Sequence, residues 1–223
     1  MSKSLGEPLP PPLPKLIYRG AEAEIYLQDW YGELAVRKSR IPKPYRIAEL
    51  DSVIRRNRTL HETNLMHEAR KIGIPVPVIR HLAPEESSFV MEYVRGPTLK
   101  EELYVATSRV RRRRCIDLGK LIARMHEGGL VHGDLTISNV VSNNGKLFLI
   151  DFGLGGFSKE LEDRGVDILL LNRAMKSTHV KYHDEMFSAF LKGYATVVGG
   201  ERKAEIVSKV REIERRGRYS ERT

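Results

Sequence analysis

The apolar pattern of this 223-residue chain changes part-way along its length. Up to about Val94, short β-favouring runs such as Ile25–Leu27 and Leu34–Val36 alternate with turn residues, which predicts an antiparallel sheet. One long segment within this part, residues 52–72, lacks Gly and Pro and is expected to form a helix. Beyond Val94 the pattern becomes mainly helical. A strand-rich first part followed by a helix-rich second part predicts an α+β chain of two lobes.

Further elements are expected on the same grounds. Strands are predicted at 76–79 and 89–94, helices at 99–104 and from about 109 to 127, and helix throughout beyond Asp163. Apolar runs around Val140 and at 147–150 are joined by Asn143-Asn144-Gly145, the signal of a hairpin. The predicted organisation is a proline-rich arm at 1–15, a first lobe at 16–94, a helical second lobe at 95–214 and a basic tail at 215–223.

Composition limits the class of protein. Apolar residues make up 41% and charged residues 30%, the balance of a globular chain. No apolar run approaches the roughly 20 residues of a membrane span, and no signal-like segment opens the chain, so no membrane association and a cytoplasmic location are expected. The single cysteine, Cys115, cannot form an internal disulfide and is expected in the core.

The formal net charge of +9 favours an acidic partner such as nucleic acid. Basic residues concentrate at 37–46, 109–114 and 202–222. The alternative, that these are only solvated surfaces, stays open at this stage.

The strongest local signal for chemistry runs from Val131 through His-Gly-Asp134 to Asn139 and resumes at Asp151-Phe-Gly. Asp134, an unprotonated carboxylate, would orient an attacking hydroxyl and accept its proton. Magnesium prefers oxygen ligands and keeps several waters, so the Asn139 amide and the Asp151 carboxylate would suffice beside phosphate oxygens. These residue types suit phosphoryl transfer, in which positioning and charge neutralisation do most of the work.

In order and spacing these motifs resemble the catalytic loop and Asp-Phe-Gly motif of the protein-kinase superfamily. The resemblance implies a bilobal protein-kinase-like fold that binds ATP and Mg²⁺. It also implies that Lys38, at the end of a predicted strand, grips the α and β phosphates and pairs with Glu62 of the following helix. Asp167 resembles the helix aspartate that braces the catalytic loop.

The adenine site implied by the resemblance is built mainly from apolar residues. The loop expected to cover the phosphates, Tyr18 to Ile25, holds one glycine where ordinary kinases have three. Backbone groups at the link between the lobes would meet the adenine edge. The residues implied as nucleotide-binding are Ile17, Gly20, Ile25, Val36, Lys38, Glu62, Glu92, Val94 and Val141; for the apolar ones, simple core packing remains the alternative.

Two departures from ordinary kinases narrow the family. Gly133 stands where arginine is usual, and the segment from Asp151 to Asp167 is short, with no Ala-Pro-Glu, so the second lobe is expected to be reduced and to lack a full activation segment. Together with Gly20-Ala-Glu-Ala23, Arg40-Ile-Pro-Lys-Pro-Tyr-Arg46 and Ser177-Thr-His179, these features are similar to the atypical kinase of the KEOPS complex, the PRPK family.

That resemblance implies an atypical serine/threonine kinase or ATPase that supports threonylcarbamoyladenosine modification of tRNA. It implies a KEOPS transferase subunit and a small KEOPS regulatory subunit as partners. Contact with tRNA is expected through basic surfaces and the tail at 215–223, where Gly217 is expected to give flexibility.

Two alternatives remain open. His-Gly-Asp with a downstream Asn also resembles small-molecule phosphotransferases of the aminoglycoside- and choline-kinase type. The other alternative is a non-catalytic RNA-binding scaffold, although RNA binding alone would not require the set of Lys38, Asp134, Asn139 and Asp151.

Overall fold

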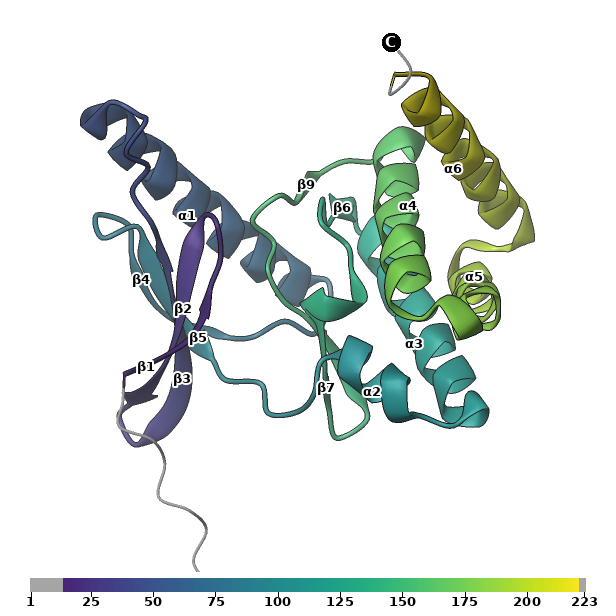
Figure 1. Cartoon of the computed structure of the whole chain (residues 1–223), viewed down its shortest axis with the longest axis horizontal. Coiled ribbons are helices and arrows are strands. Elements are labelled where there is room, and N and C mark those ends of the chain that lie inside the picture. Colours follow the sequence, from purple (N-terminus) through teal and green to yellow (C-terminus); the bar gives the residue numbers. More distant parts are fainter. Residues whose placement is uncertain (1–13, 221–223) are drawn as a thin grey trace, which may run out of the picture. The chain divides into compact units, whose positions relative to one another are not determined.

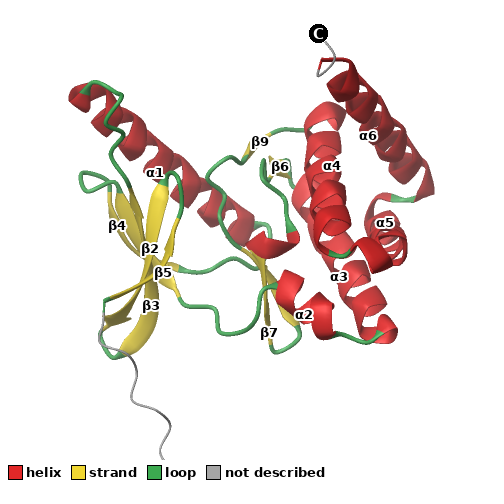
Figure 2. Ribbon diagram, viewed as in Figure 1, coloured by secondary structure: helices red, strands yellow, loops and turns green. Residues whose placement is uncertain are grey.

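The computed structural model describes residues 14–220, with side chains up to Arg216, and divides the chain into two compact units. The first unit holds residues up to Leu60 and 78–93. The second holds 61–77 and everything from Val94 onward. Strands dominate the first unit and helices the second (Figures 1 and 2). Most of the expected N-terminal arm lies outside the described residues.

The first unit is built on a five-stranded sheet in the order β1-β2-β3-β5-β4, antiparallel at every pairing. Tyr31 and Gly32 join β2 to β3 with positive φ angles of 53° and 84°, the turn geometry whose twist matches that of the strands. The predicted antiparallel sheet is thereby confirmed. The strands are β1 (Lys15–Arg19), β2 (Ala23–Trp30), β3 (Glu33–Arg40), β4 (Ile79–Ala83) and β5 (Ser88–Glu92).

One predicted strand is displaced. The segment expected at 76–79 has no regular structure before Ile79, where β4 begins. Pro75 and Pro77 explain the difference, because proline has no N–H to donate to a ladder. The carbonyl of Pro75 instead accepts a hydrogen bond from the Leu149 N–H at 2.9 Å, within the second unit.

The long helix α1 (Ala48–Lys71) begins earlier than the sequence pattern predicts. Its first turn carries Glu49 and Asp51 and its last turn Arg70 and Lys71, an arrangement that complements the helix dipole. Gly73, at φ 78°, follows its end. The division between the two units falls inside this helix, after Leu60, so the first lobe is not the continuous segment 16–94 that the sequence suggested.

The second unit combines helices with two short two-stranded sheets. Asn144 and Gly145 take positive φ angles of 47° and 82° in the turn between β7 and β8, which confirms the predicted hairpin. The elements are α2 (Leu99–Val105), α3 (Ser108–Glu127), β6 (Leu130–Val131), β7 (Val140–Asn143), β8 (Lys146–Leu149), β9 (Gly156–Phe157), α4 (Leu161–Thr178), α5 (His183–Val198) and α6 (Gly200–Ser220), with single 3₁₀ turns at Ile137–Asn139 and Val180–Tyr182.

Helices α3 and α5 cross at unusually close range. A methyl group on Gly193 would lie 2.0 Å from the carbonyl oxygen of Ile116, and one on Gly119 would lie 2.1 Å from that of Phe190. Each helix therefore presents a glycine to the backbone of the other. The crossing is buried, since Leu118, Ile122 and Phe190 are inaccessible to solvent. Cys115 lies in the same core, where burial raises the pKa of its thiol to about 12, so the expected core position is confirmed.

The last helix corrects the expectation of a tail that starts at 215. Helix α6 continues to Ser220 and packs on α4. Arg216 forms an ion pair with Glu162, and Lys209 lies 3.5 Å from the same carboxylate. These contacts extend the helix past Glu214, because they hold its side chains against a neighbouring element. Among residues 14–220, no helix has the length and apolar character needed to cross a membrane.

Replacing Gly193 by alanine tests the close crossing. We expect Gly193→Ala to lower the free energy of unfolding by about 1–3 kcal/mol, the usual cost of overpacking a buried contact. Urea titration followed by circular dichroism measures the change. Gly200→Ala is the matched control, because no atom lies within 4 Å of the added methyl group; equal stability of the two variants would contradict the close crossing.

Candidate active site

The catalytic motif of the second unit holds two of its polar side chains together. Asn139 Nδ2 donates to the backbone oxygen of Asp134 at 2.9 Å and to Asp134 Oδ2 at 3.1 Å. A single 3₁₀ turn at Ile137–Asn139 closes the loop, and the buried side chains of Leu135 and Ile137 anchor it. The carboxylate of Asp134 is exposed at this point. The arrangement presents a carboxylate of fixed direction to an incoming group.

A buried carboxylate on α4 fixes the backbone of this loop. Asp167 accepts hydrogen bonds from the N–H groups of His132 at 2.7 Å and Gly133 at 2.8 Å, one on each oxygen. His126 Nε2 lies 3.1 Å from Asp167 Oδ2, and His126 Nδ1 lies 2.9 Å from the hydroxyl of Tyr194. All three side chains of this chain of contacts are almost fully buried. The loop is therefore anchored to α3, α4 and α5 at once.

His132 joins the loop to the strand that precedes Asp151. Its Nε2 lies 3.2 Å from the Ile150 carbonyl oxygen, and its ring packs 4.9 Å from that of Phe152. Burial lowers the pKa of His132, because a charged ring in this buried position would lack the hydration that stabilises it in water. The ring is neutral near pH 7, and its position between two motifs makes it a packing element.

Gly133 is required by the short segment that follows Asp151. Its φ is 76°, and a methyl group there would lie 1.9 Å from the Leu154 carbonyl oxygen. The next residues form β9, which pairs with β6 through Val131 and Gly156, before α4 begins at Leu161. The segment lies against the catalytic loop, which leaves no room for the arginine that is usual at position 133.

Asp151 has an uncommon backbone conformation for a residue with a side chain, with φ at 63°. Its Oδ1 accepts a hydrogen bond from the Gly153 N–H at 3.2 Å. The preceding residue, Ile150, donates its N–H to the Asn139 carbonyl oxygen at 3.0 Å. This bond links the backbone before Asp151 to the loop that carries Asn139. Strained conformations of this kind concentrate where a side chain must point in one direction.

The donor set fits a magnesium ion. Because the Nδ2 group of Asn139 is used by Asp134, its Oδ1 is the atom left to act as a ligand. Asp151 adds an exposed carboxylate. No group of three or more His, Cys, Asp or Glu side chains suited to a metal occurs among residues 14–216, so a cation here would need ligands from phosphate and water, as magnesium commonly does.

In the first unit, Lys38 shares one face of the sheet with several of the implied nucleotide-binding residues. It pairs with Ile25 on β2 and with Phe89 on β5, while Val36 pairs with Leu27 and Met91. Directly paired residues of antiparallel strands project to the same side. Lys38 and Val36 are both buried. Ile17 lies at a β-bulge of β1 and is exposed.

Charged contacts fix the turn between β1 and β2 that contains Gly20. Glu22 forms an ion pair with Arg58 of α1, and Lys43 donates to the carbonyl oxygen of Ala21. The hydrogen bond from Arg58 holds the pKa of Glu22 below its usual range. The Gly20 N–H is bonded to the Ala23 carbonyl oxygen at 2.9 Å. This loop is pinned by side chains, unlike a loop of three glycines.

The remaining implied residues are spread over both units. Glu92 ends β5, where its N–H is bonded to the Val78 carbonyl oxygen at 2.8 Å, so this N–H is already used within the first unit. Val94 begins the second unit, and Val141 lies on β7 opposite Thr98. Glu62 lies in the second unit and Lys38 in the first; their pairing stays a prediction.

Sequence reasoning did not single out His126, Tyr194 or Glu22. His126 had one detectable signal, a polar residue on the otherwise buried face of α3. Glu22 had another, a lone acid between two alanines in a short turn. Tyr194 had none, because an aromatic residue on a helix usually reads as ordinary core.

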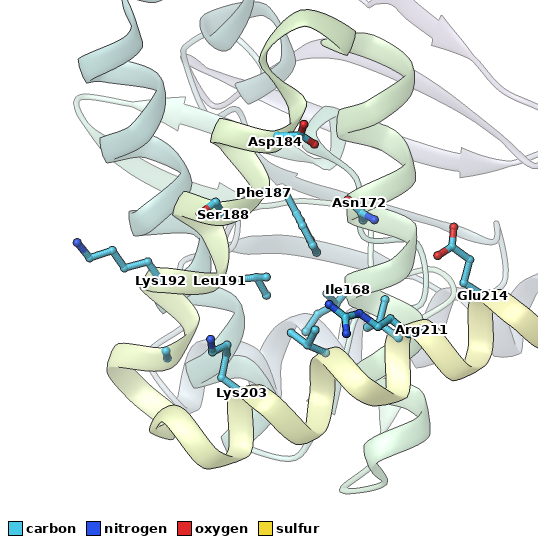
Figure 3. A pocket seen from close by; sticks show the side chains of 13 residues that line it. Ile168, Asn172, Asp184, Phe187, Ser188, Leu191, Lys192, Lys203, Arg211 and Glu214 are labelled. Carbon is cyan, nitrogen blue, oxygen red and sulfur yellow. The ribbon is translucent and has the colours of Figure 1, made fainter.

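A separate cavity of about 650 Å³ lies between α4, α5 and α6 (Figure 3). Phe187 and Ile168 point into it, and Lys203 and Arg211 of α6 border it (Figure 3). None of Asp134, Asn139 and Asp151 lines this cavity. Its size alone does not make it the site of the chemistry.

The chain is similar to known proteins of one family. The RIO domain family matches residues 33–154. The KEOPS complex subunit Bud32 of Pyrococcus abyssi is 43% identical over 94% of this chain and 98% of that protein. A probable serine/threonine-protein kinase, a BUD32 homolog of Archaeoglobus fulgidus, is 35% identical over 92% of this chain and 97% of its own length.

A longer relative matches over part of its length. The probable bifunctional tRNA threonylcarbamoyladenosine biosynthesis protein of Methanothermobacter thermautotrophicus is 41% identical over 93% of this chain, which spans only 37% of that protein. Among solved structures, the Rio2 kinase of Chaetomium thermophilum, in a complex with ADP, Mg²⁺ and phosphoaspartate, has a TM-score of 0.62 at 16% identity, covering 92% of this chain and 72% of the other.

These matches define the class as protein-kinase-like, with an antiparallel-sheet lobe and a helical lobe, and they confirm the predicted α+β fold. The chain belongs to the RIO-domain family and, within it, to the Bud32 group of KEOPS complex subunits.

Replacing Asp167 by asparagine tests the anchoring of the catalytic loop. The amide has one acceptor oxygen where the carboxylate has two, so one buried N–H of His132 or Gly133 loses its partner. We expect the free energy of unfolding to fall by about 1–3 kcal/mol, together with a loss of ATP turnover. Urea titration and a phosphate-release assay measure both. Asp184→Asn is the control, since that carboxylate is exposed and, among the described residues, has a hydrogen bond and an ion pair with His183 alone; a similar result for both variants would contradict the anchoring.

Proposed function

We propose that this chain is an ATP- and Mg²⁺-dependent atypical serine/threonine kinase and ATPase that works in the cytoplasm within a KEOPS complex. In this role it supports threonylcarbamoyladenosine modification of tRNA. The observation that carries the proposal is the catalytic loop, in which Asn139 and the buried Asp167 fix the exposed carboxylate of Asp134. Phosphoryl transfer depends mainly on such positioning.

Each polar residue has one task in this proposal. Bound MgATP supplies the phosphoryl group and the cation that neutralises its charge. Asp134 orients the attacking hydroxyl or water and accepts its proton. Asn139 and Asp151 hold the cation through oxygen atoms, and Lys38 holds the phosphates. The apolar side chains of Ile17, Ile25, Val36 and Val141 are proposed to pack on the adenine, with Gly20 in the covering turn, Glu62 as the partner of Lys38, and backbone groups of Glu92 and Val94 at the adenine edge.

The two alternatives have weaker support. Two relatives that match this chain over nearly their full length are a KEOPS subunit and a BUD32 homolog, which favours the proposed function over a small-molecule phosphotransferase. A non-catalytic scaffold would not need a buried carboxylate devoted to the backbone of one loop. The Asp167 contacts therefore favour catalysis over a non-catalytic scaffold.

The relatives support the proposed partners. One of them is named as a KEOPS subunit, and the bifunctional relative joins a segment like this chain to a longer protein of tRNA threonylcarbamoyladenosine synthesis. Covalent linkage keeps two activities at high effective concentration, which supports contact between this chain and a transferase subunit. A small regulatory subunit and tRNA complete the proposed assembly.

Changing single carboxylates tests the chemistry. We expect Asp134→Asn to lower ATP turnover about 10²-fold or more while nucleotide binding persists. Asp151→Asn should instead weaken binding of MgATP, because it removes a charged ligand of the cation. Phosphate release and calorimetric titration with MgATP separate the two effects. Asp29→Asn is the control, an exposed carboxylate in the first unit whose one hydrogen bond within residues 14–216 comes from the Gly32 N–H; wild-type turnover by Asp134→Asn would refute the assignment.

Substrate preference gives a second test. Because β9 pairs with β6 and α4 begins at Leu161, the segment after Asp151 offers no extended surface on which a free peptide could align. We expect radiolabel from ATP on serine of this chain itself and very little on casein or myelin basic protein. Phosphorylation of those proteins at about 1 s⁻¹ or faster, an ordinary kinase rate, would contradict this expectation.

A further inference from the structure

Helix α3 begins with several arginines, of which some have side-chain partners within the described part of the fold and others do not. Two of them are structural. Arg111 is buried, donates to the Ala106 carbonyl oxygen and lies 3.6 Å from the ring centre of Tyr182. Arg114 donates to Glu102 at 2.6 Å and to the Gly145 carbonyl oxygen at 2.7 Å. These two side chains tie α3 to α2 and to the β7–β8 turn.

Four other basic residues of α3 gather on a different face of the helix. Four cations line one concavity of about 660 Å³, together with Ser108, Ile116 and a single carboxylate, Asp117. The four, called here the α3 basic face, are Arg109, Arg112, Arg113 and Lys120. Within the part of the chain that the structure describes, none of them forms an ion pair or a side-chain hydrogen bond.

This face destabilises the helix that carries it. The first turn of α3 holds no acidic residue, and its N-cap, Thr107, makes no side-chain hydrogen bond to the helix. Cations near a helix N-terminus oppose the helix dipole, and like charges four residues apart, such as Arg109 and Arg113, repel each other. In contrast, α2 begins with a complete capping box of Thr98 and Glu101. The fold alone gives no reason for the α3 basic face.

We propose that the α3 basic face binds the phosphodiester backbone of RNA. Arg109 and Lys120 are about 16 Å apart along the helix axis, a span that meets several successive phosphates. Arginine, which supplies three of the four cations, offers a planar fork of donors suited to phosphate. Backbone recognition needs only such contacts and carries no sequence information.

An acidic protein is the less favoured occupant of the same surface. Stable protein interfaces have an apolar centre with aromatic or aliphatic anchors, whereas Ile116 is the only apolar side chain in this concavity. The choice of RNA also rests on the proposed function in tRNA modification. The α3 basic face would then be the surface that holds tRNA while other groups carry out the chemistry.

The test uses the full-length double variant Arg112→Gln with Arg113→Gln. Binding of an unmodified tRNA transcript is measured by fluorescence anisotropy at several salt concentrations. Each lost phosphate contact reduces the slope of log K against log salt by roughly 0.7–0.9. We expect the slope to become shallower by about 1.5 and the affinity at 0.1 M salt to fall roughly 30-fold. A melting temperature of the variant at or above that of the wild type shows that the fold is retained, because the lost charges oppose the helix dipole.

The matched control removes the same charge elsewhere, by Arg70→Gln with Arg173→Gln, two exposed arginines without ion pairs among the described residues. This control should bind tRNA like the wild type. The inference is overturned if both double variants lose the same affinity for tRNA, if the α3 variant binds tRNA as tightly as the wild type, or if the wild type does not bind tRNA. Loss of polyglutamate binding alone would also overturn it and would indicate an acidic protein as the occupant.

ATP turnover separates this inference from the proposed function. The α3 double variant should hydrolyse ATP at the wild-type rate, because none of its changes touches the catalytic loop. A wild-type protein that binds tRNA through this face but turns over no ATP would overturn the proposed function and leave the RNA surface intact.

Discussion

The arrangement of the second unit depends on the buried carboxylate of Asp167. Both of its oxygens accept backbone N–H groups of the catalytic loop, and His126 links one of them to Tyr194. A carboxylate in such a position is strongly stabilised by its hydrogen bonds, and leaving those N–H groups without a partner would be costly. These hydrogen bonds therefore fix the backbone of the loop without a ligand, and the fixed backbone sets the direction of the Asp134 side chain.

The short segment after Asp151 packs directly against this fixed loop. In a chain with a long activation segment, ordering of that segment can control the catalytic loop. Here the Leu154 carbonyl lies so close to Gly133 that only glycine fits, and β9 is paired with β6 directly beside the loop. A loop packed in this way has no separate switch to order. Control through a protein partner is the physical alternative, which agrees with membership of a family of complex subunits.

Much of this molecule could be predicted from the sequence, for identifiable reasons. The sheet and the hairpin at Asn143–Lys146 follow from local patterns, and the bracing role of Asp167 follows from the resemblance to protein kinases. The strand expected at 76–79 was wrong because Pro77 within it and Pro75 just before it cannot donate to a ladder. The helix predicted beyond Asp163 extends through residues 215–220 of the expected tail, and there Arg216 pairs with Glu162, a contact 54 positions away in sequence that no local pattern contains. The Glu22–Arg58 ion pair could not be predicted either, because its two residues are also far apart in sequence.

The arginines of α3 show most clearly how the structure differs from what the sequence alone indicates. In the sequence, Arg111 to Arg114 form one uniform run, and any of them could be a solvated surface residue. The helix directs them to different surroundings: Arg111 lies under Tyr182, Arg114 lies between Glu102 and the Gly145 carbonyl, and Arg112 and Arg113 face an open concavity. The first two compensate their desolvation through partners within the fold. The latter two form no ion pair or side-chain hydrogen bond within the described chain and oppose the helix dipole, which is why we assign them a partner on another molecule.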